Sequence, residues 1–241
     1  MQKTLRPLVA EFVGVFFLVF VGTGAIVGNT YRESVLGLVG AGPAGVGPVG
    51  VGPVGVALAF GLAFAIAVLA TRNVSGGHIN PAITLGLWSI GRIGWRQAGL
   101  YVVAQLLGAV VAALAIKGLY PEMPGRIAQL GTPQLASILT FAQGVVLEAI
   151  LTFFLAFVVM ATAADSAEPK VAGFAIGLTV TVGILAGGPL TGAALNPARA
   201  FGPALVANAW LSQLVYWVGP ILGAIAAMQL YERLLLKRDA A

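Results

Sequence analysis

The stretch Leu195-Asn196-Pro197-Ala198-Arg199 places an asparagine, a proline and an arginine inside a chain that is apolar almost throughout. The triplet Asn-Pro-Ala also occurs at Asn80-Pro81-Ala82, so that Asn196 lies 116 positions after Asn80. The residues ahead of the two triplets, 75–80 and 191–196, align at the same offset. Because the motif recurs in a matching context, we interpret the chain as a duplication.

The repeat extends in both directions from the two triplets. Downstream, residues 101–109 share five identities with residues 216–224 at an offset of 115, and upstream, residues 11–20 share five with residues 148–157 at an offset of 137. The sequence therefore predicts one domain over 1–241, with repeats of about 1–120 and 137–241. The longer upstream offset leaves about 21 extra residues in the first half. We assign them to a Gly/Pro-rich outer loop over about 37–55, which lacks helix propensity.

The composition is that of a membrane protein. Hydrophobic residues make up 59% of the chain and charged residues 9%, with a mean hydropathy of +0.98, whereas a soluble domain is about 25% charged. There is no cysteine, and His78 is the only histidine, so neither a disulfide nor a metal site is expected, and no cofactor. The net charge of +5 is scattered over segment ends, which argues against nucleic-acid binding.

Six apolar segments are long enough to cross a hydrocarbon layer of about 30 Å. The predicted spans are residues 5–27, 54–70, 97–116, 137–163, 171–187 and 211–236. Three spans per repeat is an odd number, so the second repeat must enter the membrane from the opposite side, as in an inverted repeat. The predicted fold is an all-α polytopic membrane protein.

The distribution of Lys and Arg predicts the orientation of these spans. If the N-terminus is inside, three cations fall on the outer side, Arg32, Lys117 and Arg126, and one, Arg199, belongs to the second motif. Nine fall on the inner side: Lys3, Arg6, Arg72, Arg92, Arg96, Lys170, Arg233, Lys237 and Arg238. This excess favours two cytoplasmic termini. The expected location is the cell (plasma) membrane, with a multi-pass topology.

Two apolar segments, 81–90 and 197–207, are too short to span the membrane. At 1.5 Å per residue each reaches about 15 Å, or half the hydrocarbon layer. Each begins with Asn as N-cap and Pro at the first helical position, which predicts two re-entrant half-helices whose N-termini meet near the midplane. Their non-helical lead-ins would carry unpaired carbonyls, which are tolerated beside a water-filled cavity. A pore is therefore expected.

Paired Asn-Pro-Ala motifs, Arg199 after the second of them, Glu11 and Glu148 at equivalent positions, and six spans with two half-helices resemble the aquaporin (major intrinsic protein) family over nearly the whole chain. The resemblance implies a homotetramer with one pore in each subunit. It also implies a selectivity filter. The positions of this chain that match the family's filter are Phe60, Ile184, Ala193 and Arg199.

Ile184 departs from the orthodox water-selective pattern, which has histidine at this position, and matches the archaeal M-type aquaporins. Glycerol facilitators have glycine here and an aromatic residue at the position of Ala193. The second motif continues with Ala200 where that branch has aspartate. The resemblance therefore implies a water channel that passes glycerol slowly, with a glycerol facilitator as the alternative.

The asparagines are expected to cap the half-helices while their amide N–H groups face the pore. We expect the half-helix dipoles to repel cations. By resemblance, Glu11 and Glu148 accept hydrogen bonds from the backbone of the re-entrant loops, although a proton relay is an alternative for intramembrane carboxylates. His78 either lines the pore or bonds within its loop. The other loop residues expected to line the pore are Gly76, Gly77, Gly192 and Ala194.

Three functions compete at this point. A passive channel for water and small neutral solutes, which excludes protons and ions, agrees best with the paired re-entrant motifs. A proton-coupled transporter would use Glu11, Glu148 and His78. An intramembrane enzyme has little support, because no Ser-His or paired-carboxylate arrangement converges on one site. The expected partners are the lipid bilayer, water and small neutral solutes.

Overall fold

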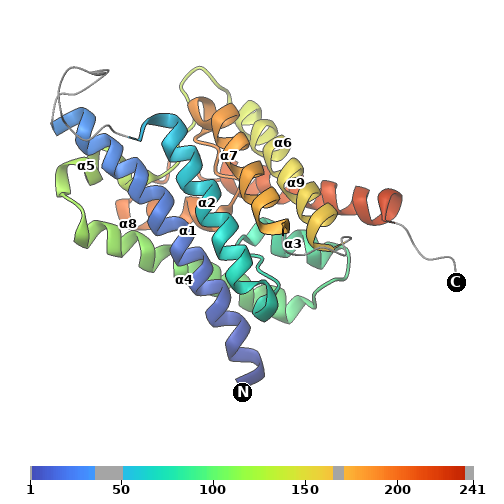
Figure 1. Ribbon diagram of the computed structural model, residues 1–241. Helices are drawn as coiled ribbons and strands as arrows, with labels where there is room; N and C mark the ends of the chain where they lie inside the picture. Colours follow the sequence, from blue (N-terminus) through green and yellow to red (C-terminus); the bar gives the residue numbers. More distant parts are fainter. Residues whose placement is uncertain (1, 36–50, 165–170, 237–241) are drawn as a thin grey trace, which may run out of the picture.

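The structure, a computed structural model, describes residues 2–35, 51–164 and 171–236. Most of the Gly/Pro-rich loop predicted over 37–55 lies outside these residues. The described parts are helices, turns and connecting loops. Figure 1 shows the long helices side by side in one bundle.

Among the described residues, five helices are long and apolar enough to cross a membrane. They are α1 (Gln2–Val35), α2 (Gly52–Ser75), α4 (Trp95–Leu119), α6 (Phe141–Val159) and α7 (Ala172–Thr191). The last predicted span corresponds to α9 (Val215–Leu230) and its continuation η3 (Tyr231–Leu235), a π-helical turn. Helix α6 continues in the same way into η2 (Met160–Ala164). The predicted all-α polytopic fold is confirmed.

Two spans begin later than the sequence predicted. Helix α6 begins at Phe141 rather than 137, because Thr140 and Gln143 form a capping box in which each side chain bonds the other residue's backbone. Helix α9 begins at Val215 rather than 211, since Ser212 has a φ of +58° and residues 211–214 form turns. Hydropathy alone does not detect where either helix begins.

The connection between α4 and α6 holds two short elements that were not predicted. They are α5 (Glu122–Ile127) and η1 (Gln129–Gly131), a 3-10 turn. All three residues of η1 have positive φ, of +46°, +50° and +73°, an uncommon backbone for non-glycine residues. This segment packs against α1 and α8.

The two half-helices are α3 (Pro81–Ser89) and α8 (Pro197–Ala207). The first has nine residues and the second eleven, so at 1.5 Å per residue each covers about half of the hydrocarbon layer. Helix α3 packs mainly against α9, and α8 packs mainly against α4. Each half-helix therefore rests on the last long helix of the other half of the chain.

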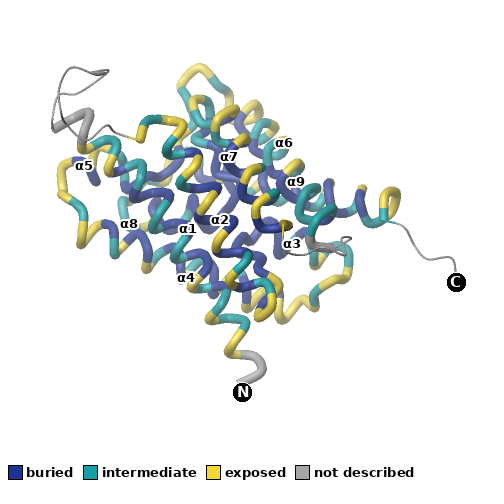
Figure 2. Tube along the Cα trace, in the orientation of Figure 1, coloured by how far each residue is buried: buried dark blue, intermediate teal, exposed yellow. Residues whose placement is uncertain are grey.

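Small residues let the long helices approach closely. A Cβ added to Gly108 of α4 would overlap the carbonyl oxygen of Phe12 in α1, and one added to Gly223 of α9 would overlap that of Ala149 in α6. Such contacts are typical of helix packing in membranes. Large apolar residues remain exposed on the outward faces, and the buried positions lie inside the bundle (Figure 2), as expected for a multi-pass membrane protein.

Candidate functional site

The N-termini of α3 and α8 meet through their capping asparagines. The side-chain oxygen of Asn80 accepts a hydrogen bond from Ala82 N (2.8 Å), and that of Asn196 accepts one from Ala198 N (3.0 Å). The Nδ2 atoms reach across: Asn80 donates to the carbonyl oxygen of Leu195 (2.8 Å), and Asn196 donates to that of Ile79 (2.9 Å). Each amide nitrogen carries two hydrogens, so one N–H of each joins the loops and the other is available to the space between them.

These crossed bonds correct one expectation about the re-entrant loops. The lead-in carbonyls were expected to be unpaired, yet those of Ile79 and Leu195 accept the asparagine amides. Both residues have positive φ, of +53° and +51°, which is uncommon for a non-glycine residue and more so for a β-branched one. The two loops hold each other in this conformation through the asparagines.

Glu11, buried in α1, supports the first loop. One carboxylate oxygen accepts hydrogen bonds from Ser75 Oγ (2.6 Å) and His78 N (3.0 Å). The other accepts them from Ile79 N (2.6 Å) and Gln105 Nε2 (2.7 Å). Four donors therefore converge on a group that only accepts when it is ionised.

Glu148, buried in α6, makes the equivalent contacts to the second loop. It accepts hydrogen bonds from Thr191 Oγ1 (2.7 Å) and from the backbone N–H groups of Ala194 (2.9 Å) and Leu195 (2.9 Å). Tyr216 donates to the carbonyl oxygen of Thr191 (2.8 Å). The two carboxylates occupy corresponding places in the two halves of the chain.

Arg199, at the start of α8, is 3% exposed. Its Nη1 donates to the carbonyl oxygen of Gly131 (2.9 Å), and its Cζ lies 4.8 Å from the centroid of the Phe60 ring, within cation–π range. Its Nε has no hydrogen-bond partner within the described chain. The guanidinium is thus held between the carbonyl of Gly131 and the ring of Phe60.

Three spaces follow one another through the middle of the bundle. The first, the Arg199-side cavity of about 470 Å³, is lined by residues that include Phe60, Gly131, Ile184, Gly192 and Arg199. The last, the His78-side cavity of about 290 Å³, is lined by residues that include Phe64, Arg72, Gly76, Gly77, His78 and Arg92. The central void between them measures about 10 Å³, close to the smallest space that holds one water molecule.

Shared lining residues place these spaces next to one another. Phe60, Ile184 and Arg199 line both the Arg199-side cavity and the central void. Phe64 lines both the central void and the His78-side cavity. Both asparagines of the repeated motif border the central void as well. The two larger cavities, which we call the mouths, therefore lie on either side of the central void, which both motifs border.

The residues predicted for the pore are distributed unevenly along this path. Among the described residues, the second loop contributes Ala194, Leu195 and Asn196 to the central void, whereas Ala193 lies buried in the core with a φ of +41°. The prolines and alanines of the two motifs are buried at the starts of the half-helices. Sequence reasoning missed the apolar wall of the void formed by Leu18, Leu155 and Val180.

His78 both lines the path and bonds locally, so the two alternatives left open by the sequence coexist. Its Nδ1 lies 3.2 Å from Thr84 Oγ1, and its ring meets Tyr101 edge to face at 5.1 Å between centroids. Glu11 and Glu148, in contrast, border none of the three spaces. With their oxygens occupied by loop donors, they are poorly placed to relay protons.

Comparison with known proteins agrees with this geometry. Residues 1–231 match the family described as Major intrinsic protein. Aquaporin TIP4-4 of Zea mays is 42% identical, with 96% of this chain and 87% of that protein covered, and aquaporin NIP1-1 of Zea mays is 37% identical, with 95% and 74% covered. The crystal structure of the aquaglyceroporin from Plasmodium falciparum superposes with a TM-score of 0.77 at 25% identity, over 96% of this chain and 97% of that chain.

Proposed function

The chain belongs to the major intrinsic protein family, and from this premise we propose that solutes cross it along the path between the Arg199-side and His78-side cavities. It is a channel for water and small solutes and not an enzyme. The observation that carries the proposed route is the arrangement of the three spaces, in which two large cavities lie on either side of a central void of about 10 Å³. Asn80, Asn196 and Arg199 border this void.

Hydrogen-bond donors on one side and apolar walls on the other explain how water passes. The free N–H groups of Asn80 and Asn196 offer donors to a water oxygen, and Arg199 borders the same void. The apolar wall of Leu18, Leu155 and Val180 gives water no competing partner. A single file of water therefore keeps its oxygens toward the motif residues as it crosses.

Positive charge along the path opposes the entry of cations. The N-termini of α3 and α8 each contribute the equivalent of about half a positive charge at the central void, and Arg199 adds a full charge at its border with the wide mouth. A cation loses its hydration in the void and meets this field, so its entry is unfavourable. Protons are opposed by the same field.

The filter that we propose consists of Phe60, Ile184 and Arg199, with a fourth wall from the loop that contains Ala193 and Ala194. Isoleucine offers an aliphatic surface opposite the guanidinium. A small polyol can therefore place its carbon face on Ile184 and its hydroxyls on Arg199. We expect water as the main solute and glycerol as a slow one. The likeness to an aquaglyceroporin structure keeps a glycerol facilitator as the second candidate.

The archaeal M-type assignment rests on Ile184 alone, since the relatives reported above are plant proteins. We also propose the plasma membrane as the location, with the termini and the His78-side cavity facing the cytoplasm. Arg72 and Arg92 line that cavity, which agrees with the excess of cations predicted for the inner side. Protease accessibility of a C-terminal tag in sealed vesicles tests the orientation.

We further propose an inverted repeat and a homotetramer with one pore per subunit. The crossed packing of α3 on α9 and of α8 on α4, together with the matched contacts of Glu11 and Glu148, supports the repeat. Three adjacent spaces within one chain support one pore per subunit. Light scattering in detergent should give a protein mass four times that of the 24.5 kDa chain.

Osmotic shrinkage of proteoliposomes tests the proposed function. Liposomes with the channel should shrink at least tenfold faster in an impermeant osmolyte than empty ones, should pass glycerol slowly, and should show no acceleration by a pH gradient. Water flux coupled to the pH gradient would support the proton-coupled transporter instead.

A further inference from the structure

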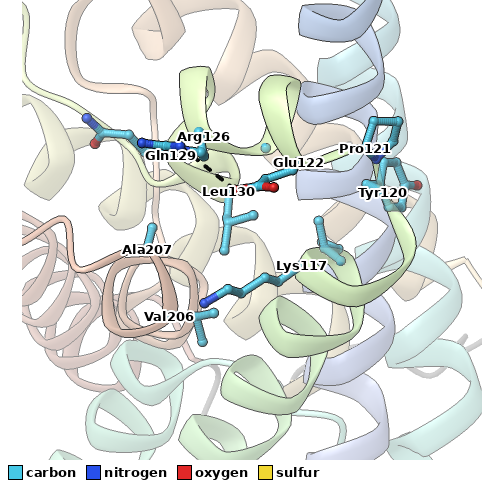
Figure 3. A pocket seen from close by; sticks show the side chains of 11 residues that line it. Lys117, Tyr120, Pro121, Glu122, Arg126, Gln129, Leu130, Val206 and Ala207 are labelled. Carbon is cyan, nitrogen blue, oxygen red and sulfur yellow. Dashed lines mark ion pairs between the residues drawn. The ribbon is translucent and has the colours of Figure 1, made fainter.

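A second large cavity lies outside the conduction path. It measures about 440 Å³ and shares no lining residue with the three spaces of the path. Its walls come from the last turns of α4 and α8, from α5 and from η1. Figure 3 shows Lys117 and Leu130 projecting into it from opposite sides. We call it the lateral cavity.

The lateral cavity carries a net positive charge from its side chains. Among the described residues, Lys117 and Arg126 line it together with one carboxylate, Glu122. The pair between Arg126 and Glu122 is long, at 3.8 Å, and both side chains are at least 80% exposed, so it contributes little. Lys117 has no ion pair with any described residue. Its ammonium group extends toward Val206 at the end of α8 (Figure 3), where it offsets the negative end of that helix.

An exposed apolar stripe leads along α4 to this cavity. Leu107, Val111 and Leu114 are each between 41% and 54% exposed, and Lys117 follows Leu114 by three positions. Residues three or four apart lie on one face of a helix, so the stripe ends at the lysine. A phosphate with an attached hydrocarbon chain matches this order of charge and apolar surface.

We propose that the lateral cavity binds the anionic headgroup of a membrane phospholipid, with its phosphate at Lys117 and Arg126 and an acyl chain on the stripe of α4. Free phosphate has the same charge chemistry as the headgroup, but it has no acyl chain to contact the apolar stripe of α4. Hydroxyls of a glycerol headgroup can donate to Glu122 and to the carbonyls at the helix ends. Phosphatidylglycerol supplies all of these groups.

The bound lipid acts on the filter through η1. Gln129 and Leu130 line the lateral cavity, and the next residue, Gly131, accepts the hydrogen bond from Arg199 in the conduction path. The three residues of η1 hold positive φ, and Gly131 packs tightly against Thr23. A headgroup that contacts Gln129 and Leu130 therefore favours the backbone that positions Arg199. The lipid sets the conductance without entering the pore.

Lipid binding is tested first, because it does not depend on channel activity. The protein is mixed with phosphatidylglycerol in detergent, and bound lipid is counted by native mass spectrometry. The double variant Lys117→Gln/Arg126→Gln should retain at least fivefold less lipid than the parent, whereas Lys117→Arg should retain it. Arg96→Gln removes an exposed cation from the other end of α4 and is the matched control. Equal retention in the parent and the double variant would overturn the proposal.

The effect on the filter rests on the proposed function and is measured by water flux. Parent liposomes with phosphatidylglycerol should conduct at least twofold more water per channel than phosphatidylcholine liposomes, and the double variant should show no such difference. If binding is lost in the double variant but flux still responds, the link through η1 is wrong. If inorganic phosphate in phosphatidylcholine liposomes reproduces the effect, the ligand is a soluble anion and not a lipid. A parent without water flux in either lipid contradicts the channel path while the binding result still stands.

Discussion

The guanidinium of Arg199 donates a hydrogen bond of 2.9 Å to the carbonyl oxygen of Gly131, a residue 68 positions earlier in the chain. Arg199 also lies over the Phe60 ring. The two contacts hold the charge at the border between the wide mouth and the central void. The cost of burying an arginine at membrane depth is several kcal/mol, which a role in ion exclusion explains.

Replacing Arg199 with Val should raise the leakage of protons or monovalent cations by at least tenfold while water still passes. The change removes the fixed charge and opens the constriction. Leakage is measured with a pH-sensitive dye in liposomes under a potassium gradient. A folded variant that remains as ion-tight as the parent would show that Arg199 is not the barrier.

Replacing Ile184 with His should lower glycerol flux by at least tenfold, equivalent to about 1.4 kcal/mol of added barrier. The imidazole narrows the opening and replaces the aliphatic surface with a polar one, so water flux should change much less. Both fluxes are measured at matched protein density. A parallel fall of the two fluxes, or an unchanged glycerol flux, would mean that Ile184 does not discriminate between solutes.

Glu148→Gln should destabilise the protein by about 2 kcal/mol, because the N–H groups of Ala194 and Leu195 donate to different carboxylate oxygens and the amide NH₂ would face one of them, which leaves a buried donor unpaired. The readout is the thermal unfolding midpoint in detergent. Glu232→Gln, which breaks only the partly exposed pair with Arg92, is the control and should shift the midpoint little. Equal shifts would argue against a supporting role for Glu148.

Gly108→Val should reduce the folded yield and lower the unfolding midpoint, since any side chain at this position overlaps the backbone of α1 at Phe12. Gly99 lies on the same helix with open space around it, so Gly99→Val provides the matched control. Size-exclusion profiles and the midpoint are compared. If both variants behave like the parent, α1 and α4 do not pack as closely as described.

The half-helices and the loops that precede them were predictable because their signals are local. Asn followed by Pro specifies an N-cap and a first helical residue, and repetition of the motif indicated that both sites act together. The buried positions of Glu11 and Glu148 followed from two carboxylates at equivalent places in apolar spans. Their bonds to the loop backbone agree with the family resemblance.

The segment from α5 to η1 was not predictable from its residues. Glu122 to Gly131 shows no helical periodicity, and its conformation depends on contacts with α1 and α8. The hydrogen bond between Arg199 and Gly131 joins residues 68 positions apart, so no local sequence pattern predicts it. Similarly, no pattern in the sequence indicates that Ala193, which the family resemblance places in the filter, has a buried side chain and a positive φ, whereas Ala194 lines the central void. A shift of one residue along an irregular loop changes which side chain faces the path.

The central claim, that water passes Ile184, can be tested directly because the chain contains no cysteine. Ile184→Cys is reconstituted and treated with a methanethiosulfonate reagent, and Val182→Cys, exposed on the outer face of the same helix α7, is treated in parallel. The account predicts that modification of Ile184→Cys lowers osmotic water flux to the level of empty liposomes, that dithiothreitol restores it, and that Val182→Cys is unaffected. Complete labelling of Ile184→Cys with unchanged water flux would contradict it.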